Sequence, residues 1–151
     1  MSRKATTQEL KSALEEALDT LPNPHDLSQP NLYLCPRLVD CNGSTLTVEL
    51  EYDTKSWMSN PMGVVHGGIL ASMLDTSMGL TCHGIVQIHT PTISMNIHYA
   101  RPVPLNQTVR VRTTAFMAGS TTIQLQAQLY LPAEPERILV SASGIYYCRG
   151  K

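Results

Sequence analysis

The segment from Asn60 to Asp75 carries the residue types that acyl-transfer chemistry requires. An Asn-Pro-Met-Gly loop leads through His66 into Gly67 and Gly68, where an apolar helical pattern begins. The first N–H groups of a helix have no partner within the helix, and the helix dipole is partly positive there. Glycine has no Cβ, so a substrate carbonyl oxygen can approach this backbone closely. The segment therefore predicts an N–H donor for the oxyanion of a tetrahedral intermediate.

Two side chains accompany these glycines. His66 lies at or next to the helix cap, where its ring can fix the loop or touch a ligand. Asp75 is the one acid of an apolar helix, and burying such a carboxylate is costly unless it is hydrogen-bonded or faces a wet cleft. A Gly-Gly pair before a helix is often only a tight turn, and a lone mid-helix Asp can simply bond nearby backbone. Their joint spacing favours a general base or nucleophile at Asp75.

The spacing between Gly67 and Asp75 limits how they can act together. They are eight residues apart in sequence, which is roughly 12 Å along a helix axis. One carbonyl group cannot touch both, so two copies of the chain must contribute if both groups act on one substrate. A two-fold axis between antiparallel helices would bring the two groups together. The spacing therefore predicts an obligate homodimer with two shared sites.

The elements that must position these residues follow from hydrophobic periodicity. Apolar residues at helical spacing predict an amphipathic helix over 6–19 and a long interior helix over 66–82. Loops are predicted at 22–30, after the first helix, and at 54–65, before the second. Asn42-Gly43 predicts a hairpin. Alternating residues predict strands near 38–41, 44–52, 92–99, 108–116, 122–131 and 138–147. Short links predict that consecutive strands are antiparallel neighbours, which gives an α+β fold with one long helix against an antiparallel sheet.

Bulk properties narrow the class of protein. A length of 151 residues fits one domain, and 42% hydrophobic residues allow a core. A net charge of −1 gives no indication of a nucleic-acid partner. The N-terminus shows no signal peptide, and no apolar run approaches the roughly 20 residues of a membrane span. We therefore expect a cytoplasmic protein without a membrane partner, whose four cysteines are reduced core residues.

The motif resembles that of the hotdog-fold acyl-CoA thioesterases of the phenylacetic-acid-degradation type, which carry His-Gly-Gly. The match covers six residues at the family's spacing: Asn60, Gly63, His66, Gly67, Gly68 and Asp75. Residues 95–102 look like the family's strand after the central helix, and the element order from about residue 32 also fits. The resemblance implies a single hotdog domain over 1–151, in which a long central helix is wrapped by a sheet of five or six strands. Residues 1–31 would form an N-terminal helix and loop extension.

The resemblance also implies an activity, the hydrolysis of an acyl-CoA thioester to free acid and coenzyme A. Asp75 matches the catalytic carboxylate, as nucleophile or as base for water, and Gly67 matches the backbone donor to the thioester carbonyl. Asn60 matches the side chain that holds the carbonyl or the water, and His66 matches its supporting neighbour. Thr92 falls where relatives place a water-positioning Ser or Thr. Alternation puts it on the polar face of its strand, which is compatible with this role but does not decide it.

Substrate contacts are expected from Gly68, Met73, Met95 and Arg101. The methionines could line an acyl pocket or equally well fill the core. Arg101 could face the phosphates of coenzyme A, whereas Arg110 and Arg112 are more typical of a solvated strand face. The resemblance implies no metal and no cofactor, since coenzyme A is part of the substrate. It also implies a homodimer, commonly paired into a homotetramer.

Two other functions remain open at this point. One is a non-catalytic hotdog module that binds acyl-CoA as a sensor or structural partner. The other is a hydratase or dehydratase on the same fold, which commonly uses a His-led pair rather than a lone acid after His-Gly-Gly. The sequence does not indicate which acyl group is preferred.

Overall fold

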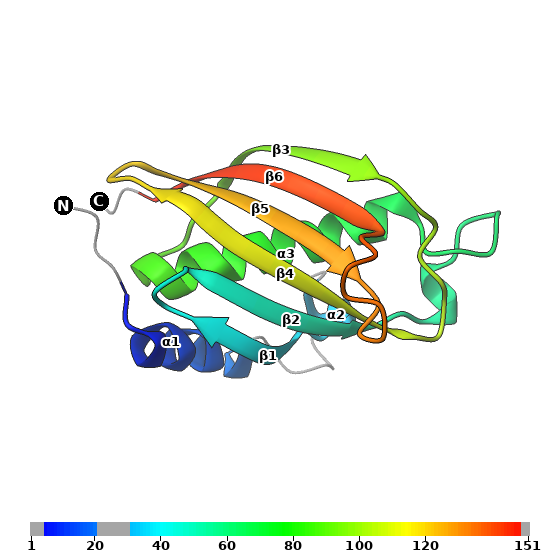
Figure 1. Cartoon of the computed structure of the whole chain (residues 1–151), viewed down its shortest axis with the longest axis horizontal. Helices are drawn as coiled ribbons and strands as arrows, with labels where there is room; N and C mark the ends of the chain where they lie inside the picture. The colour runs from blue at the N-terminus through cyan, green and yellow to red at the C-terminus, as the bar shows by residue number, and fades with distance from the viewer. Residues whose placement is uncertain (1–4, 21–30, 149–151) are drawn as a thin grey trace.

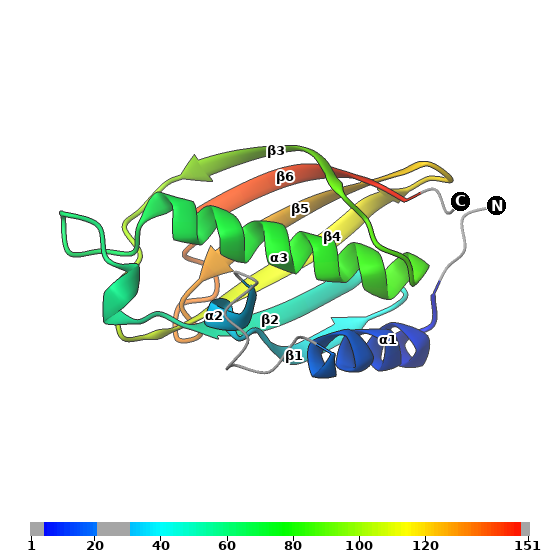
Figure 2. The same cartoon turned by 180° about the vertical axis from the view of Figure 1, so that it is seen from behind.

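A six-stranded antiparallel sheet packs against one long helix in the computed structural model of the chain (Figures 1 and 2). The structure describes residues 5–20 and 31–148. The order of strands across the sheet is β1-β2-β4-β5-β6-β3. The elements in chain order are α1 (Thr7–Asp19), α2 (Asn31–Leu34), β1 (Arg37–Asn42), β2 (Thr47–Asp53), the 3-10 helix η1 (Ser56–Met58), α3 (Gly67–Val86), β3 (Thr92–Tyr99), β4 (Thr108–Ala118), β5 (Thr122–Tyr130) and β6 (Val140–Tyr147).

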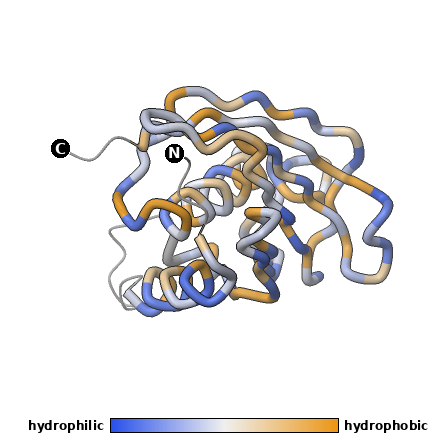
Figure 3. The backbone as a smooth tube through the Cα atoms, turned by 60° about the vertical axis from the view of Figure 1, so that its left-hand side comes forward, coloured by the Kyte–Doolittle hydropathy of each residue, from blue (hydrophilic) through white to orange (hydrophobic). Residues whose placement is uncertain are grey.

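The predicted helices and strands are confirmed, with changes at their ends. The interior helix runs on to Val86 and ends at Gln87, which takes a left-handed conformation with φ 55°. The helix η1 lies inside the predicted loop 54–65, and α2 lies where the sequence predicts no element. The predicted loop over 22–30 lies outside the described residues. Hydrophobic and hydrophilic residues alternate along the strands, as Figure 3 shows.

The hairpin between β1 and β2 is longer than the predicted two-residue turn. Asn42 ends β1 and pairs with Thr47, so four residues connect the strands. The Asn42 Oδ1 accepts hydrogen bonds from the backbone N–H groups of Ser44 and Thr45, at 2.9 and 3.1 Å. This Asx-type turn offers the backbone an alternative to the tight hairpin.

The expectation that consecutive strands are neighbours is wrong for β3 and β4. β3 pairs with β6 at one edge of the sheet, whereas β4 lies between β2 and β5. The eight-residue link 100–107 therefore spans three strand spacings. Such a span is about 14 Å, well within the reach of eight extended residues at about 3.3 Å each. A short link thus permits a neighbouring strand but does not require one.

Helix α3 is the centre of the core. Leu70, Met73, Leu74 and Met78 are each at most 3% exposed. By its length and composition, α3 could cross a membrane. The expectation that no apolar run approaches the length of a membrane span is therefore wrong. In the fold, 56% of its most apolar stretch is buried. A core helix needs the same apolar surface as a membrane helix, because neighbouring elements cover it on several sides.

Helix α1 covers part of α3 as an amphipathic helix. Thr6 and Glu9 form a capping box at its start, in which each side chain bonds the other residue's backbone N–H. Leu10 and Leu14 are fully buried. Three cysteines lie in the interior as expected, but Cys35 is exposed, so the expectation of four core cysteines is wrong for that residue. Its backbone has φ 44° in the turn before β1.

The outer face of the sheet, turned away from α3, is polar over β2 and β4. Arg110 pairs with Glu51 at 3.1 Å, and Arg112 pairs with Glu49 at 3.3 Å. Arg37 adds an ion pair with Asp53 at 2.7 Å, and the pKa values of Asp53 and Glu51 lie below the ordinary range because Arg37 hydrogen-bonds to both. These pairs occupy Arg110 and Arg112 within the sheet, in line with a solvated strand face.

We predict that Thr113→Val stabilises the protein. Thr113 is fully buried, and its Oγ1 is the one buried side-chain oxygen or nitrogen without a hydrogen-bond partner among the described residues. Valine has nearly the same shape and removes this unpaired hydroxyl, so the free energy of unfolding in urea should rise by about 1 kcal/mol. Thr81→Val is the control, because the buried Thr81 hydroxyl donates to the Ser77 carbonyl at 2.8 Å and should give no gain. A Thr113→Val protein less stable than the parent would contradict this account.

Candidate active site

The N-terminus of α3 is capped by His66. Its Nδ1 accepts a hydrogen bond from the Gly68 N–H at 2.9 Å, and its backbone is extended at φ −62°, ψ 136°. A ring nitrogen that accepts carries no proton, so the neutral imidazole holds its hydrogen on Nε2. The His66 ring is exposed. His66 therefore fixes the start of the helix and presents an N–H donor to solvent beside it.

Gly67 is the first residue of α3 and is half-buried. No described residue accepts a hydrogen bond from its N–H, as expected for the first turn of a helix. The Gly67 carbonyl accepts a hydrogen bond from the Tyr99 hydroxyl at 3.0 Å. Tyr99 lies at the end of β3 and anchors this turn, a role that no sequence pattern indicated. The Gly67 N–H is thus a fixed donor available to a ligand.

The loop before α3 is organised by Asn60. Its Oδ1 accepts from the N–H groups of Met62 and Val64, at 2.9 and 3.3 Å. Gly63 follows at φ 75°, a conformation that suits glycine. Because these N–H groups occupy the amide oxygen, the Asn60 NH₂ group remains as the donor for a carbonyl or a water. In Figures 1 and 2 this loop, between η1 and α3, extends away from the sheet.

Asp75 lies in the middle of α3 and is half-buried. Its Oδ1 accepts two short hydrogen bonds, from Thr92 Oγ1 at 2.7 Å and from the Tyr146 hydroxyl at 2.6 Å. None of the described residues donates to its Oδ2. The cost of placing a carboxylate on an apolar helix is thereby offset at one oxygen. The other oxygen is left to act as a base or nucleophile.

The structure turns Thr92 towards α3, contrary to the alternation that put it on the polar face. The register between β3 and β6 shifts between Thr92 and Ser94, which is a β-bulge, and Thr92 pairs with the inward-facing Tyr146. A bulge inserts one residue and changes which face the neighbours occupy. Thr92, which the sequence predicts as a site residue, thus contacts Asp75, and simple alternation would not allow this contact.

Tyr146 is the residue at this site that sequence reasoning missed. It lies on β6, and its side chain is 1% exposed. Alternation in β6 puts Ala142, Gly144 and Tyr146 on the buried face. This pattern predicts that Tyr146 is buried, but it does not predict which residue its hydroxyl contacts. The pairing of β6 with β3 is what places the phenol beside Asp75.

The remaining predicted substrate residues are spread over the molecule. Gly68 is exposed in the first turn of α3, and Met95 is half-buried on β3. Met73 is fully buried in the core, which favours the core-filling alternative for this side chain. Arg101 is exposed just after β3, and its guanidinium donates to the Ile138 carbonyl at 2.8 Å. Within the described ranges, no group of three or more His, Cys, Asp or Glu could hold a metal ion.

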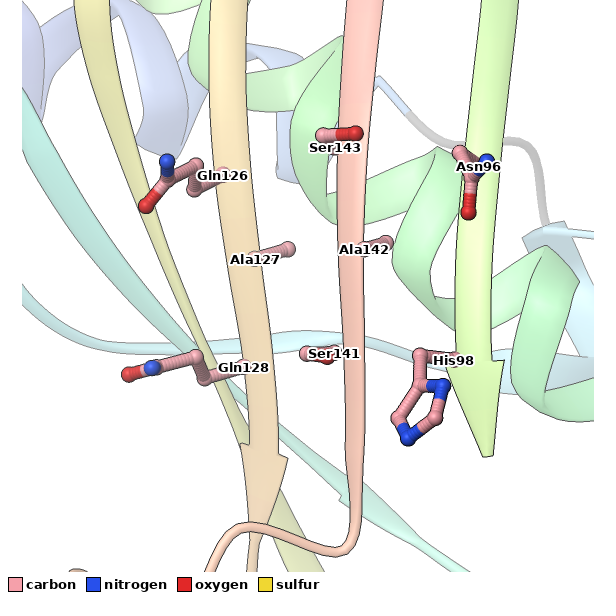
Figure 4. Close-up of a pocket in the computed structure, with 8 residues that line it drawn as sticks. All are labelled: Asn96, His98, Gln126, Ala127, Gln128, Ser141, Ala142 and Ser143. Atoms are coloured by element: carbon pink, nitrogen blue, oxygen red, sulfur yellow. The ribbon is translucent and has the colours of Figure 1, made fainter. Parts of the chain in front are cut away.

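A polar hollow lies elsewhere, on the outer face of the sheet (Figure 4). It has a volume of about 260 Å³. Amide, hydroxyl and imidazole side chains surround it, from Asn96, His98, Gln126, Gln128, Ser141 and Ser143. The sheet separates this hollow from α3, so none of the predicted site residues lines it.

The sequence matches the family model described as "Thioesterase superfamily" over residues 62–136. The matched region contains His66, Gly67, Asp75 and Thr92. About half of the chain is thus similar to this superfamily, and the long helix packed against an antiparallel sheet is the hotdog fold.

Solved structures have the same fold at low sequence identity. The Escherichia coli PaaI protein of the phenylacetic acid degradation operon gives a TM-score of 0.80 at 13% identity, covering 97% of each chain. A phenylacetic acid degradation-related protein from Ralstonia eutropha JMP134 gives 0.75 at 17%, covering 89% of this chain and 98% of that one. A Streptococcus mutans UA159 protein bound to acetyl CoA gives 0.69 at 18%, covering 77% and 90%.

We predict that the free energy of unfolding falls in alkaline solution, because two tyrosine hydroxyls and one cysteine thiol are buried in their protonated form. Burial raises the pKa of Tyr52, Tyr146 and Cys82 well above their ordinary values, and for Tyr146 the bond to Asp75 raises the pKa further. The folded protein keeps protons that the unfolded chain releases near pH 8.5 for a thiol and 10 for a phenol. The contribution of these groups to stability is therefore complete below about pH 8 and is lost as pH rises, by about 1.4 kcal/mol per pH unit for each group.

The measurement is the free energy of unfolding in urea between pH 7 and pH 10.5. Tyr146→Phe removes one of the three groups and should make the decline above pH 10 shallower. A free energy of unfolding that stays level up to pH 10.5 would show that these groups ionise in the folded state as readily as in the unfolded chain.

Proposed function

We propose that this protein hydrolyses an acyl-CoA thioester to a free acid and coenzyme A. The observation that carries the proposal is the Asp75 carboxylate, which is held through one oxygen by Thr92 and Tyr146 and is open at the other. The Gly67 N–H at the start of the same helix supplies the donor that a developing oxyanion requires. The match of residues 62–136 to the thioesterase superfamily supports the same reaction class.

In the base route, Asp75 Oδ2 accepts a proton as a water oxygen attacks the thioester carbonyl carbon. The carbonyl oxygen becomes an oxyanion, which the Gly67 N–H stabilises. The C–S bond then breaks, the free acid leaves, and the coenzyme A thiolate takes up a proton. In the nucleophile route, Asp75 Oδ2 attacks the carbonyl carbon, the C–S bond breaks, and coenzyme A leaves as a thiolate that takes up a proton. Water then hydrolyses the mixed anhydride, which releases the free acid and restores the Asp75 carboxylate. The open oxygen serves both routes.

The site proposed is shared between two copies of the chain. The rigid α3 helix holds the Gly67 N–H and the Asp75 carboxylate roughly 12 Å apart, too far for one carbonyl. Strand β3 lies beside α3 in Figure 2, pairs only with β6 among the described strands, and exposes Ile93 (56%) and Tyr99 (50%). An unpaired strand edge with exposed apolar side chains is suited to pairing with a second copy. A homodimer, and its pairing into a tetramer, are part of this proposal.

Coenzyme A is the proposed carrier of the acyl group. Two proteins of this fold are described with this type of ligand, the S. mutans protein with acetyl CoA and a hypothetical thioesterase from Streptococcus pneumoniae TIGR4 with coenzyme A. Arg101 is exposed after β3 and is our candidate contact for the coenzyme A phosphates. No cofactor beyond the substrate is required by either route.

We predict that Asp75→Asn abolishes most of the hydrolysis. The release of free thiol from a panel of acyl-CoAs should fall at least about 100-fold in kcat, because the amide is neither a base nor a nucleophile. Asp19→Asn, at the far end of α1, is the control and should retain full activity. Equal thiol release by Asp75→Asn and the parent would remove Asp75 from the reaction. A parent protein that binds acyl-CoA and releases no thiol would instead indicate the non-catalytic binding module.

We predict that two inactive variants restore activity when they assemble together. Gly67→Pro removes the N–H while keeping a favourable residue at the first helical position, and the extended His66 backbone accepts a following proline. Gly67→Ala is the matched control: it keeps the N–H, and its Cβ would lie 3.5 Å from the Tyr99 ring, an ordinary contact.

Co-expressed Gly67→Pro and Asp75→Asn chains should regain about a quarter of the parent activity, because half of the dimers are mixed and each of these has one intact site. Gly67→Ala alone should keep more activity than Gly67→Pro, because it retains the N–H. No recovery in the mixed sample, with mixed dimers verified by mass, would place both groups of one reaction centre within a single chain.

A further inference from the structure

The Tyr146 phenol contacts Asp75 but exchanges no proton in either proposed route. Its hydroxyl donates to Asp75 Oδ1 at 2.6 Å and lies 3.2 Å from the Asp75 backbone carbonyl. We propose that Tyr146 is a positioning residue that, with Thr92, fixes the orientation of the Asp75 carboxylate and so directs Oδ2 at the substrate. This inference rests on the proposed function of Asp75.

The arrangement of donors around Asp75 is asymmetric. Thr92 and Tyr146 come from two paired strands and both donate to Oδ1, although an ionised carboxylate can accept about four hydrogen bonds over two oxygens. The terminal torsion of an aspartate is broad and weakly restrained by itself. Two donors on one oxygen restrict that rotation and leave the second oxygen without a donor among the described residues. Pre-orientation of this kind lowers the barrier because the reacting group needs no reorganisation.

The phenol itself is held in place by the packing around its ring. A Cβ added at Gly144 would lie 2.9 Å from the Tyr146 ring and 3.0 Å from the Met78 sulfur, so the strand needs glycine at this position. On the α3 side, a Cβ at Gly79 would lie 3.8 Å from the same ring. Burial and the neighbouring Asp75 raise the pKa of Tyr146, so its hydroxyl keeps its proton and remains a donor at neutral pH.

Tyr52 provides an internal comparison for a purely structural role. It is also fully buried and also reaches from the sheet to α3, where its hydroxyl lies 2.7 Å from Ser77 Oγ and 3.2 Å from the Met73 carbonyl. None of these partners is an ionisable group. Loss of the Tyr52 hydroxyl should therefore change stability, whereas loss of the Tyr146 hydroxyl should change the chemistry as well.

The test compares Tyr146→Phe with Tyr52→Phe in acyl-CoA hydrolysis. Tyr146→Phe should lower kcat about 10- to 100-fold while KM stays within about threefold, because the orientation of the reacting group is lost and the binding groups remain. Tyr52→Phe should keep kcat within about twofold. Gly144→Ala, which displaces the ring but keeps the phenol, should repeat the kcat loss. A kcat for Tyr146→Phe close to that of the parent, or an equal loss in Tyr52→Phe, would overturn the inference.

A second measurement is independent of activity. Crystal structures of the parent and Tyr146→Phe in one crystal form should show the Asp75 carboxylate in one orientation in the parent and rotated or in several orientations in the variant. An unchanged carboxylate in Tyr146→Phe would overturn the positioning role. If the parent releases no thiol from any acyl-CoA, the proposed function fails, and this structural comparison alone decides whether Tyr146 orients Asp75.

Discussion

The burial of α3 beneath the sheet is the constraint on which the rest of the structure depends. A helix covered on several sides must be apolar nearly all round, and α3 meets this with Leu70, Met73, Leu74 and Met78. A carboxylate on such a helix survives only if the covering layer supplies hydrogen-bond donors. β3 and β6 supply them through Thr92 and Tyr146. The hydrogen bonds that offset the cost of placing Asp75 on this helix therefore also orient its carboxylate.

This dependence makes the register of two strands part of the site. Thr92 and Tyr146 are register partners across β3 and β6. A bulge next to Thr92 brings its side chain to the inner face, where alternation in β6 places Tyr146. A slip of one residue would turn Tyr146 outwards and leave Asp75 without its donors. Gly144 contributes by leaving room for the Tyr146 ring. The chemistry of the helix is thus determined by the geometry of the sheet edge.

At the N-terminus of α3, the N–H groups of the first turn have no partners within the helix. The His66 ring accepts one of them, from Gly68, and leaves the Gly67 N–H without a described partner. Asn60 holds the preceding loop through its own amide oxygen. Because a helix is rigid, this donor and Asp75 stay apart within one chain, which is the physical reason to propose a site shared between two copies.

The sequence by itself determined the local features. The capped helix start at His66, the lone acid Asp75 within an apolar helix, and the alternating strands all follow from short-range spacing, and the structure contains each of them. It did not determine the order of the strands or the partners of Asp75. Strand pairing joins residues far apart in the chain, here Thr92 with Tyr146, and an eight-residue link between β3 and β4 is compatible with more than one order. Only the tertiary structure decided that β3 lies beside β6, and with it that a tyrosine from the last strand meets the carboxylate of the central helix.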